Sequence, residues 1–172
     1  GNYDRPEWEC DSWRDIVQAG AWVLCTRGVR REGTTLGEDR WTYRSLTAAR
    51  AELRDATAVL RARYPGKVQE GVQVLAGLSL GAYYARQMAI DEPARFARVV
   101  LIEGGAGGWT DAAARRFVRG GGRRVVFACG QAGCAREARR AIAAIERAQG
   151  QARLTYDPEA GHNYSDRMLR EL

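Results

Sequence analysis

The chain alternates short apolar runs with longer amphipathic runs. The short runs are rich in β-branched and aromatic residues, and they predict strands at 22–25, 72–76, 98–102, 124–129 and 152–156. Several of these runs are continuously apolar, which is typical of strands buried on both faces of a parallel sheet.

The longer runs between the strands predict helices. They cover Ser12 to Ala19, Ser45 to Arg63, Leu80 to Ile90, Thr110 to the glycines at 120–122, Ala135 to Ala148, and Ser165 to Leu172. Strands that alternate with helices at this spacing indicate βαβ units with right-handed crossovers. We therefore predict one α/β domain over residues 1–172, a three-layer α/β/α sandwich with a mostly parallel sheet of five to six strands.

One long connection interrupts this pattern. Residues 27–42 are polar and glycine-rich, and they follow the end of the first predicted strand. Ligand sites in parallel sheets gather at such strand ends. The segment is predicted to be a surface loop, with part of a substrate rim as the alternative.

Composition is that of a folded protein. The 172 residues are 45% apolar and 28% charged, which suits a domain with its own core. No apolar run approaches the ~20 residues of a membrane span, and the start does not resemble a signal peptide. The sequence begins at Gly1 without a methionine, which favours a mature, processed or trimmed product.

The net charge is +6, and almost all of the positive charge is arginine, because Lys67 is the only lysine. The arginines are spread along the chain and mixed with acidic residues, without a dense basic tract or an aromatic RNA-binding motif. Nucleic-acid binding is therefore not expected, although a basic interaction module remains an alternative.

The four cysteines are Cys10, Cys25, Cys129 and Cys134. They form no Cys-x-x-Cys pair and have no histidine nearby, so a zinc site is not expected. Cys129 and Cys134 flank a short glycine-containing segment, which allows either a local disulfide or two free thiols. Together with the start of the sequence, the cysteines favour a secreted or periplasmic protein over a cytosolic one.

The segment 76-AGLSLGA-82 contains the pattern Gly-x-Ser-x-Gly around Ser79. In a glycine-rich chain this pattern is weak alone, but a nucleophile elbow also requires a strand before the serine and a helix after it. Both are predicted here. The sharp turn is expected to exclude side chains at both flanking glycines, and the backbone N–H of Leu80 becomes a candidate oxyanion donor.

A serine nucleophile needs a base, and the chain has one histidine, His162, in the loop after the last predicted strand. A lone histidine is more often a structural or surface residue. Its place in this loop, together with the elbow, favours the role of general base for Ser79.

These features resemble the α/β-hydrolase superfamily of serine esterases, lipases and thioesterases. The resemblance covers essentially the whole chain and is most specific at 76-AGLSLGA-82, 93-PARFARVVLIEGG-105 and 160-AGHNYSD-166. By this match the second oxyanion N–H comes from Asn2 or Tyr3. The family's strand before that loop has no counterpart here, which would open a gap in the sheet. The resemblance therefore implies a truncated chain, association with a missing N-terminal piece, or strands that pair differently.

The resemblance also suggests where the acid lies. The family's most frequent position, after the penultimate strand, offers no early carboxylate. The alternative position follows the strand after the nucleophile helix, where Glu103 stands. We predict Glu103 as the acid, with Glu137 and Asp157 as alternatives. Asp157 and Glu159 are close to His162 in sequence and are expected to shape its loop.

The predicted function is that of a serine hydrolase that cleaves a small-molecule carboxylic ester or thioester through an acyl-enzyme, without metal or organic cofactor. Little sequence remains for a large cap, which favours small or exposed esters. Trp109 is the predicted substrate-pocket aromatic, with a core position as its alternative. The main alternative function is a non-catalytic binding protein with the same fold; a nucleotide binder is disfavoured because 104-GGAGG-108 does not match the known phosphate-binding patterns.

Overall fold

The computed structural model describes residues 5–18, 20–35, 38, 40–69, 71 and 73–171. Contacts within the chain divide it into two compact units, Gly1–Glu70 and Gly71–Leu172. The single domain over residues 1–172 stays a prediction.

The second unit is built on a four-stranded parallel sheet with the order β3-β4-β5-β6. The strands are β3 (Val74–Leu78), β4 (Arg98–Ile102), β5 (Arg124–Cys129) and β6 (Gln151–Tyr156). The predicted bounds of β4 and β5 are confirmed. The strand β3 begins and ends two residues later than predicted, and β6 begins one residue earlier.

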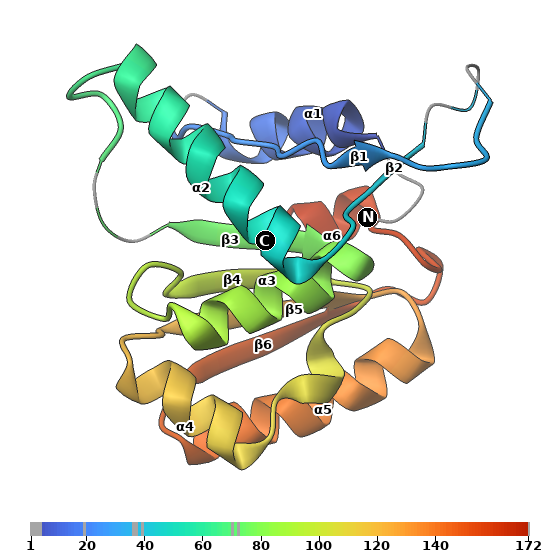
Figure 1. Cartoon of the computed structure of the whole chain (residues 1–172). Helices are drawn as coiled ribbons and strands as arrows, with labels where there is room; N and C mark the ends of the chain where they lie inside the picture. Colours follow the sequence, from blue (N-terminus) through green and yellow to red (C-terminus); the bar gives the residue numbers. More distant parts are fainter. Residues whose placement is uncertain are drawn as a thin grey trace. The chain divides into compact units, whose positions relative to one another are not determined.

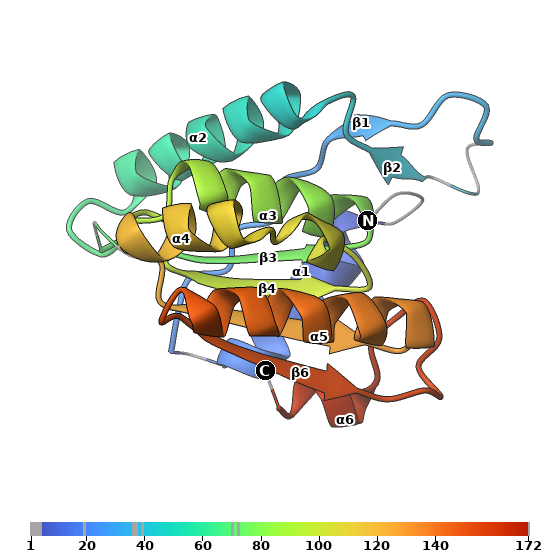
Figure 2. The same cartoon turned by 90° about the horizontal axis from the view of Figure 1, so that it is seen from below.

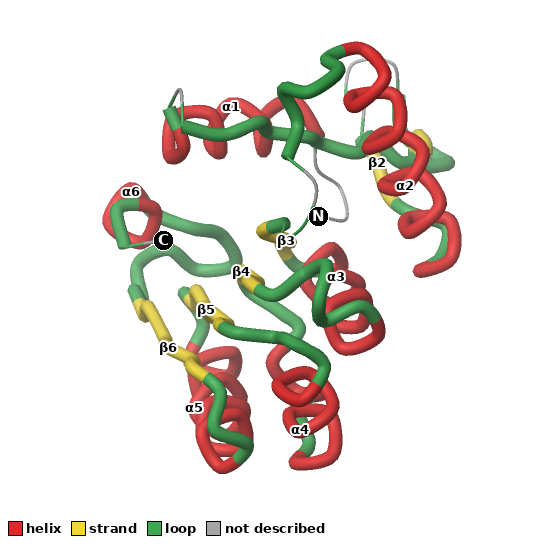
Figure 3. The backbone as a smooth tube through the Cα atoms, turned by 90° about the vertical axis from the view of Figure 1, so that its left-hand side faces the viewer, coloured by secondary structure: helices red, strands yellow, loops and turns green. Residues whose placement is uncertain are grey.

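Three helices join successive strands of this sheet (Figure 1): α3 (Leu80–Asp91), α4 (Asp111–Arg119) and α5 (Ala132–Arg147). They lie side by side on one face, because right-handed crossovers that always step in one direction place every helix on the same side (Figures 2 and 3). The short helix α6 (Asp166–Leu169) lies on the other face (Figure 3). The predicted three-layer α/β fold is thus confirmed.

The core of the second unit lies between the sheet and these three helices. Val99 and Leu101 of β4 stand in register beside Val125 and Phe127 of β5, and all four are at most 1% exposed. Residues two apart in a strand share one face, so these four side chains form a continuous apolar layer. Burial of this layer fixes the register of the strands, and with it the positions of the residues that follow each strand.

The first unit contains α1 (Pro6–Val17), the antiparallel pair β1 (Val29–Arg30) and β2 (Trp41–Thr42), and α2 (Leu46–Arg63). The predicted N-cap Ser45 is confirmed, since its hydroxyl accepts a hydrogen bond from the Ala48 N–H. Residues 27–42, which were predicted as a loop, contain the short antiparallel pair of β1 and β2.

The predicted strand at 22–25 is wrong. The structure assigns no strand to these residues. Trp22 is half exposed and its indole N–H donates to the Lys67 carbonyl, while Cys25 forms a disulfide with Cys10. An apolar run becomes a strand only where a neighbouring strand pairs with it, and a four-residue run does not specify that neighbour.

Candidate functional site

The carboxyl ends of three parallel strands bring together Ser79, Glu103 and His162. Ser79 follows β3, Glu103 follows β4, and His162 stands in the loop after β6. The His162 Nε2 lies 3.0 Å from the Ser79 Oγ, and the His162 Nδ1 lies 3.4 Å from the Glu103 Oε2. Each ring nitrogen of His162 thus faces one of the two partners that the sequence predicted.

The backbone turns sharply at Ser79. This residue has φ 53° and ψ −117°, between the last residue of β3 and the first residue of α3. A positive φ is costly for a residue with a side chain, so the surrounding structure must hold it in place. The Ser79 N–H donates to the Ile102 carbonyl, and the Ser79 carbonyl accepts from the Ala82 N–H. The Ser79 hydroxyl makes no cap hydrogen bond to α3 and instead meets His162.

The two glycines that flank Ser79 are not equivalent. A Cβ added at Gly77 would lie 2.4 Å from the carbonyl of Gly81, so the crossing of β3 and α3 excludes a side chain there. A Cβ at Gly81 would meet none of the described atoms within 4 Å. The expectation that both glycines are sterically required is therefore confirmed for Gly77 and wrong for Gly81.

The Glu103 carboxylate is buried and hydrogen-bonded to backbone N–H groups. The side chain of this residue is 1% exposed, and its backbone also has a positive φ of 47°. The Oε1 accepts hydrogen bonds from the backbone N–H groups of Gly130 and Gln131, the second at 2.9 Å. These donors belong to the N-terminal end of α5, where the helix dipole also favours a negative charge. With Oε1 engaged, Oε2 is left to face His162.

The turn after Glu103 packs directly against the turn at Ser79. A Cβ at Gly104 would lie 2.8 Å from the Ser79 carbonyl oxygen, and a Cβ at Gly105 would lie 2.6 Å from the Ala82 carbonyl oxygen. Gly105 also has a φ of +72°. Glycine at both positions allows the two turns to approach each other, which sets the spacing between the acid and the serine.

The loop that carries His162 is closed by Asp157. The Ser165 hydroxyl donates to the Asp157 Oδ2 at 2.6 Å, and the Glu159 N–H donates to Oδ1 at 3.2 Å. The hydrogen bond from Ser165, followed by that from Glu159, holds the pKa of Asp157 below its ordinary value. The same Ser165 hydroxyl caps α6 by accepting from the Met168 N–H.

The other candidate carboxylates lie elsewhere. Glu137 is exposed on α5, near Gly107, and Asp157 is occupied by Ser165 and Glu159. Within the described ranges, Glu103 is the carboxylate that lies at ion-pair distance from the His162 ring.

The remaining predicted site residues divide into three cases. Leu80 is the first residue of α3, so its N–H belongs to the helical turn that has no acceptor within the helix. Asn2 and Tyr3 lie outside the described residues. Trp109 is 5% exposed and packs edge-to-face on Phe117, with the ring centroids 5.2 Å apart, which is the position of a core aromatic. Its role in substrate binding stays a prediction.

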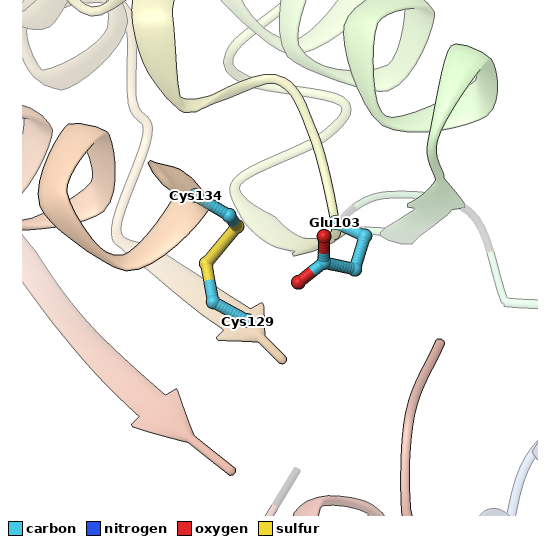
Figure 4. Close-up of side chains that lie close together, drawn as sticks. All are labelled: Glu103, Cys129 and Cys134. Carbon is cyan, nitrogen blue, oxygen red and sulfur yellow. A yellow bond between two sulfur atoms is a disulfide. The ribbon is translucent and has the colours of Figure 1, made fainter. Parts of the chain in front are cut away.

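Two features of this region were not anticipated in full. Cys129 and Cys134 form a disulfide, which the sequence left open against two free thiols. Figure 4 shows the Glu103 carboxylate beside this disulfide, and the two sulfur atoms and one carboxylate oxygen lie within 4.8 Å of one another. Since both sulfur atoms are bonded to each other, the group offers no thiolate to a metal ion. The backbone N–H groups that hold Glu103 were also missed, and a glycine directly after a buried strand was their one sequence signal.

Comparison with known proteins adds no assignment: no family model, no curated protein and no solved structure matches the chain. None of the helices in the described part of the chain is both long enough and apolar enough to cross a membrane.

Proposed function

We propose that the protein is a serine hydrolase that cleaves a carboxylic ester or thioester through an acyl-enzyme. The observation that carries this proposal is the engagement of both ring nitrogens of His162, one by the Ser79 hydroxyl and the other by the buried Glu103 carboxylate. A base oriented by an acid and in contact with a hydroxyl is the arrangement that activates a serine. We also propose membership of the α/β-hydrolase superfamily, which the elbow turn at Ser79 supports.

In the proposed first step, the Ser79 Oγ attacks the carbonyl carbon while His162 Nε2 takes the hydroxyl proton. Glu103 accepts the Nδ1–H, keeps the imidazole in the required tautomer and stabilises the imidazolium that forms. The electron pair of the carbonyl moves to oxygen, and the Leu80 N–H donates to this anion. A second donor from Asn2 or Tyr3 is part of the proposal.

Collapse of the intermediate breaks the bond to the alcohol or thiol, which leaves with the proton from His162. Water then repeats the sequence on the acyl-enzyme, with His162 as base, and releases the acid. Each step moves protons and electron pairs among the substrate, water and these side chains, so neither a metal nor an organic cofactor takes part.

Accessibility supports small or exposed esters as the substrate class. The His162 side chain is 54% exposed, and Ser79 is partly exposed, whereas Glu103 is buried. The two groups that touch the substrate are thus reachable, and the group that only orients the base is shielded from water.

Hydrolysis of a short activated ester such as p-nitrophenyl acetate tests the proposal. We expect turnover by the wild-type protein, and loss of that turnover in Ser79→Ala and in His162→Ala, each checked for native circular dichroism. A wild-type protein without turnover on short esters and thioesters would favour the alternative, a non-catalytic binding protein. Full activity in Ser79→Ala would contradict the role of Ser79 as nucleophile, and full activity in His162→Ala would contradict the role of His162 as base.

A further inference from the structure

The loop between β5 and α5 contacts both the acid and the segment that carries the base. Gly130 and Gln131 donate their N–H groups to the Glu103 Oε1. Gly130 also packs against the loop after β6, since a Cβ added to it would lie 2.2 Å from the Gly161 carbonyl oxygen. The distance between Glu103 and His162 therefore depends on where this one loop lies.

The disulfide closes that loop at its two ends. Cys129 is the last residue of β5 and is fully buried, and Cys134 stands in the first turn of α5. The bond between them spans Gly130 and Gln131, and its sulfur atoms lie next to the carboxylate that these residues hold (Figure 4).

The start of α5 differs from that of three other helices in how it is capped. Three other helices begin with a side chain that caps the first turn: Ser45 for α2, Thr110 for α4 and Ser165 for α6. The N-cap of α5 is Gln131, which makes no side-chain cap hydrogen bond. Residues 131–133 are exposed, and Gly133 has no side chain to pack. The disulfide thus stands where α2, α4 and α6 have a side-chain cap.

We propose that the Cys129–Cys134 disulfide is a positioning element for the acid: it holds the N–H groups of Gly130 and Gln131 against Glu103 and so keeps the carboxylate against His162. This inference rests on the proposed hydrolase function for its effect on turnover. Its structural part, the placement of Glu103 beside His162, has a separate measurement.

The chain offers a matched control, because it contains a second disulfide, Cys10–Cys25, in the first unit. Cys10–Cys25 closes a separation of 15 residues, against 5 for Cys129–Cys134. Loop-closure entropy rises with loop length, so Cys10–Cys25 is expected to contribute more to stability. If Cys129–Cys134 positions the acid, its removal should lower kcat more than removal of Cys10–Cys25.

The first experiment compares the kcat of Cys129→Ala/Cys134→Ala with that of Cys10→Ala/Cys25→Ala. Alanine is chosen because serine would bury an unpaired hydroxyl at position 129. We expect kcat to fall ~10- to 100-fold in the first variant, with KM within about twofold, since a small misplacement of a catalytic group costs this much. The second variant should keep kcat within about twofold and lose more thermal stability. Equal kcat values in the two variants would overturn the proposal.

A coupling measurement separates positioning from general loosening. If the disulfide acts through Glu103, its removal in a Glu103→Gln background should lower kcat less than about threefold further. The same large loss in both backgrounds would show that the disulfide acts by another route.

Gln131→Pro gives a second variant if the cysteine variant does not fold. It removes one N–H donor and keeps both cysteines, and the Gln131 φ of −93° is near the proline range. We expect kcat to fall at least ~5-fold, because the Glu103 Oε1 keeps one of its two donors. A wild-type kcat in this variant would contradict the hydrogen-bonding part of the proposal.

Proton NMR of His162 tests the structural part without any activity. The chain has a single histidine, so its downfield Hδ1 signal, which arises when Nδ1–H is hydrogen-bonded to a carboxylate, needs no assignment by residue. We expect this signal in the wild type and in Cys10→Ala/Cys25→Ala, and its loss in Cys129→Ala/Cys134→Ala and in Glu103→Gln. This pattern in a protein without esterase activity would refute the function and keep the positioning role; an unchanged signal in Cys129→Ala/Cys134→Ala would refute the positioning role.

Discussion

The turns at Ser79 and Glu103 are alike in backbone and opposite in surroundings. Each follows a parallel strand, each holds a residue with a side chain at a φ near +50°, and each packs against the other. The Ser79 side chain is partly exposed and meets one polar partner, whereas the Glu103 carboxylate is buried with both oxygens engaged. Two turns with the same backbone conformation can therefore leave one side chain accessible and bury the other. The hydrogen-bond donors that follow the neighbouring strand make this difference.

The largest effect is expected at the exposed turn. Ser79→Ala removes the nucleophile, and we expect turnover of a p-nitrophenyl ester to fall on the order of 10⁴-fold or more. The free energy of unfolding, measured in urea, should change by less than about 1 kcal/mol, because the Ser79 hydroxyl is partly exposed and alanine keeps the same turn. A variant that loses activity and stability together would indicate a structural serine instead.

The buried turn gives the next effect. Glu103→Gln keeps the shape of the side chain but removes its charge, so the imidazolium loses its stabilising partner; we expect kcat to fall about 10³- to 10⁴-fold. Glu137→Gln, on the exposed face of α5, serves as the control and should keep wild-type kcat. The opposite order of the two variants would transfer the acid role from Glu103 to Glu137.

A smaller pair of changes tests the steric basis of the serine turn. Gly77→Ala pushes a methyl group into the backbone of Gly81 and should lower the free energy of unfolding by about 1–3 kcal/mol. The methyl group of Gly81→Ala would meet none of the described atoms. This substitution should change the free energy of unfolding by at most about 1 kcal/mol, because alanine has the higher helix propensity. Urea unfolding of both variants measures the difference, and equal losses would contradict the unequal roles of the two glycines.

The smallest expected effect concerns the His162 loop at low pH. The folded-state pKa of Asp157 lies below its unfolded value, so the contribution of this carboxylate to stability is present above the unfolded pKa of about 3.9 and is lost as pH falls through the lower, folded value. Thermal unfolding between about pH 6 and pH 2 should show an acid-side decrease that is reduced in Asp157→Asn. An identical pH profile for both proteins would show that Asp157 does not contribute.

The buried sheet was the easiest part to predict. The bounds of β4 and β5 follow from continuous apolar runs rich in β-branched residues, which are typical of strands buried on both faces of a parallel sheet. The short run at 22–25 is also continuously apolar. A strand depends on a partner as well, and a partner is not a local property of the sequence.

The site likewise contains residues that the local sequence predicted and contacts that it did not predict. Ser79 was predicted from the Gly-x-Ser-x-Gly pattern, His162 as the single histidine in the loop after the last predicted strand, and Glu103 from the resemblance. All three come after predicted strands, and parallel strands bring such residues to one edge. The Gly130 and Gln131 donors and the disulfide Cys10–Cys25 were not predicted, because they depend on how separate segments approach in space. The space that the described residues leave open at Gly81 was missed for the same reason.

The most direct test of the central claim is covalent labelling by a fluorophosphonate, which reacts with an activated serine, followed by mass-spectrometric mapping of the adduct. We expect one adduct, on Ser79, which forms more slowly in Glu103→Gln and does not form in His162→Ala. Absence of an adduct from the folded wild-type protein, or an adduct on another residue, would contradict this expectation.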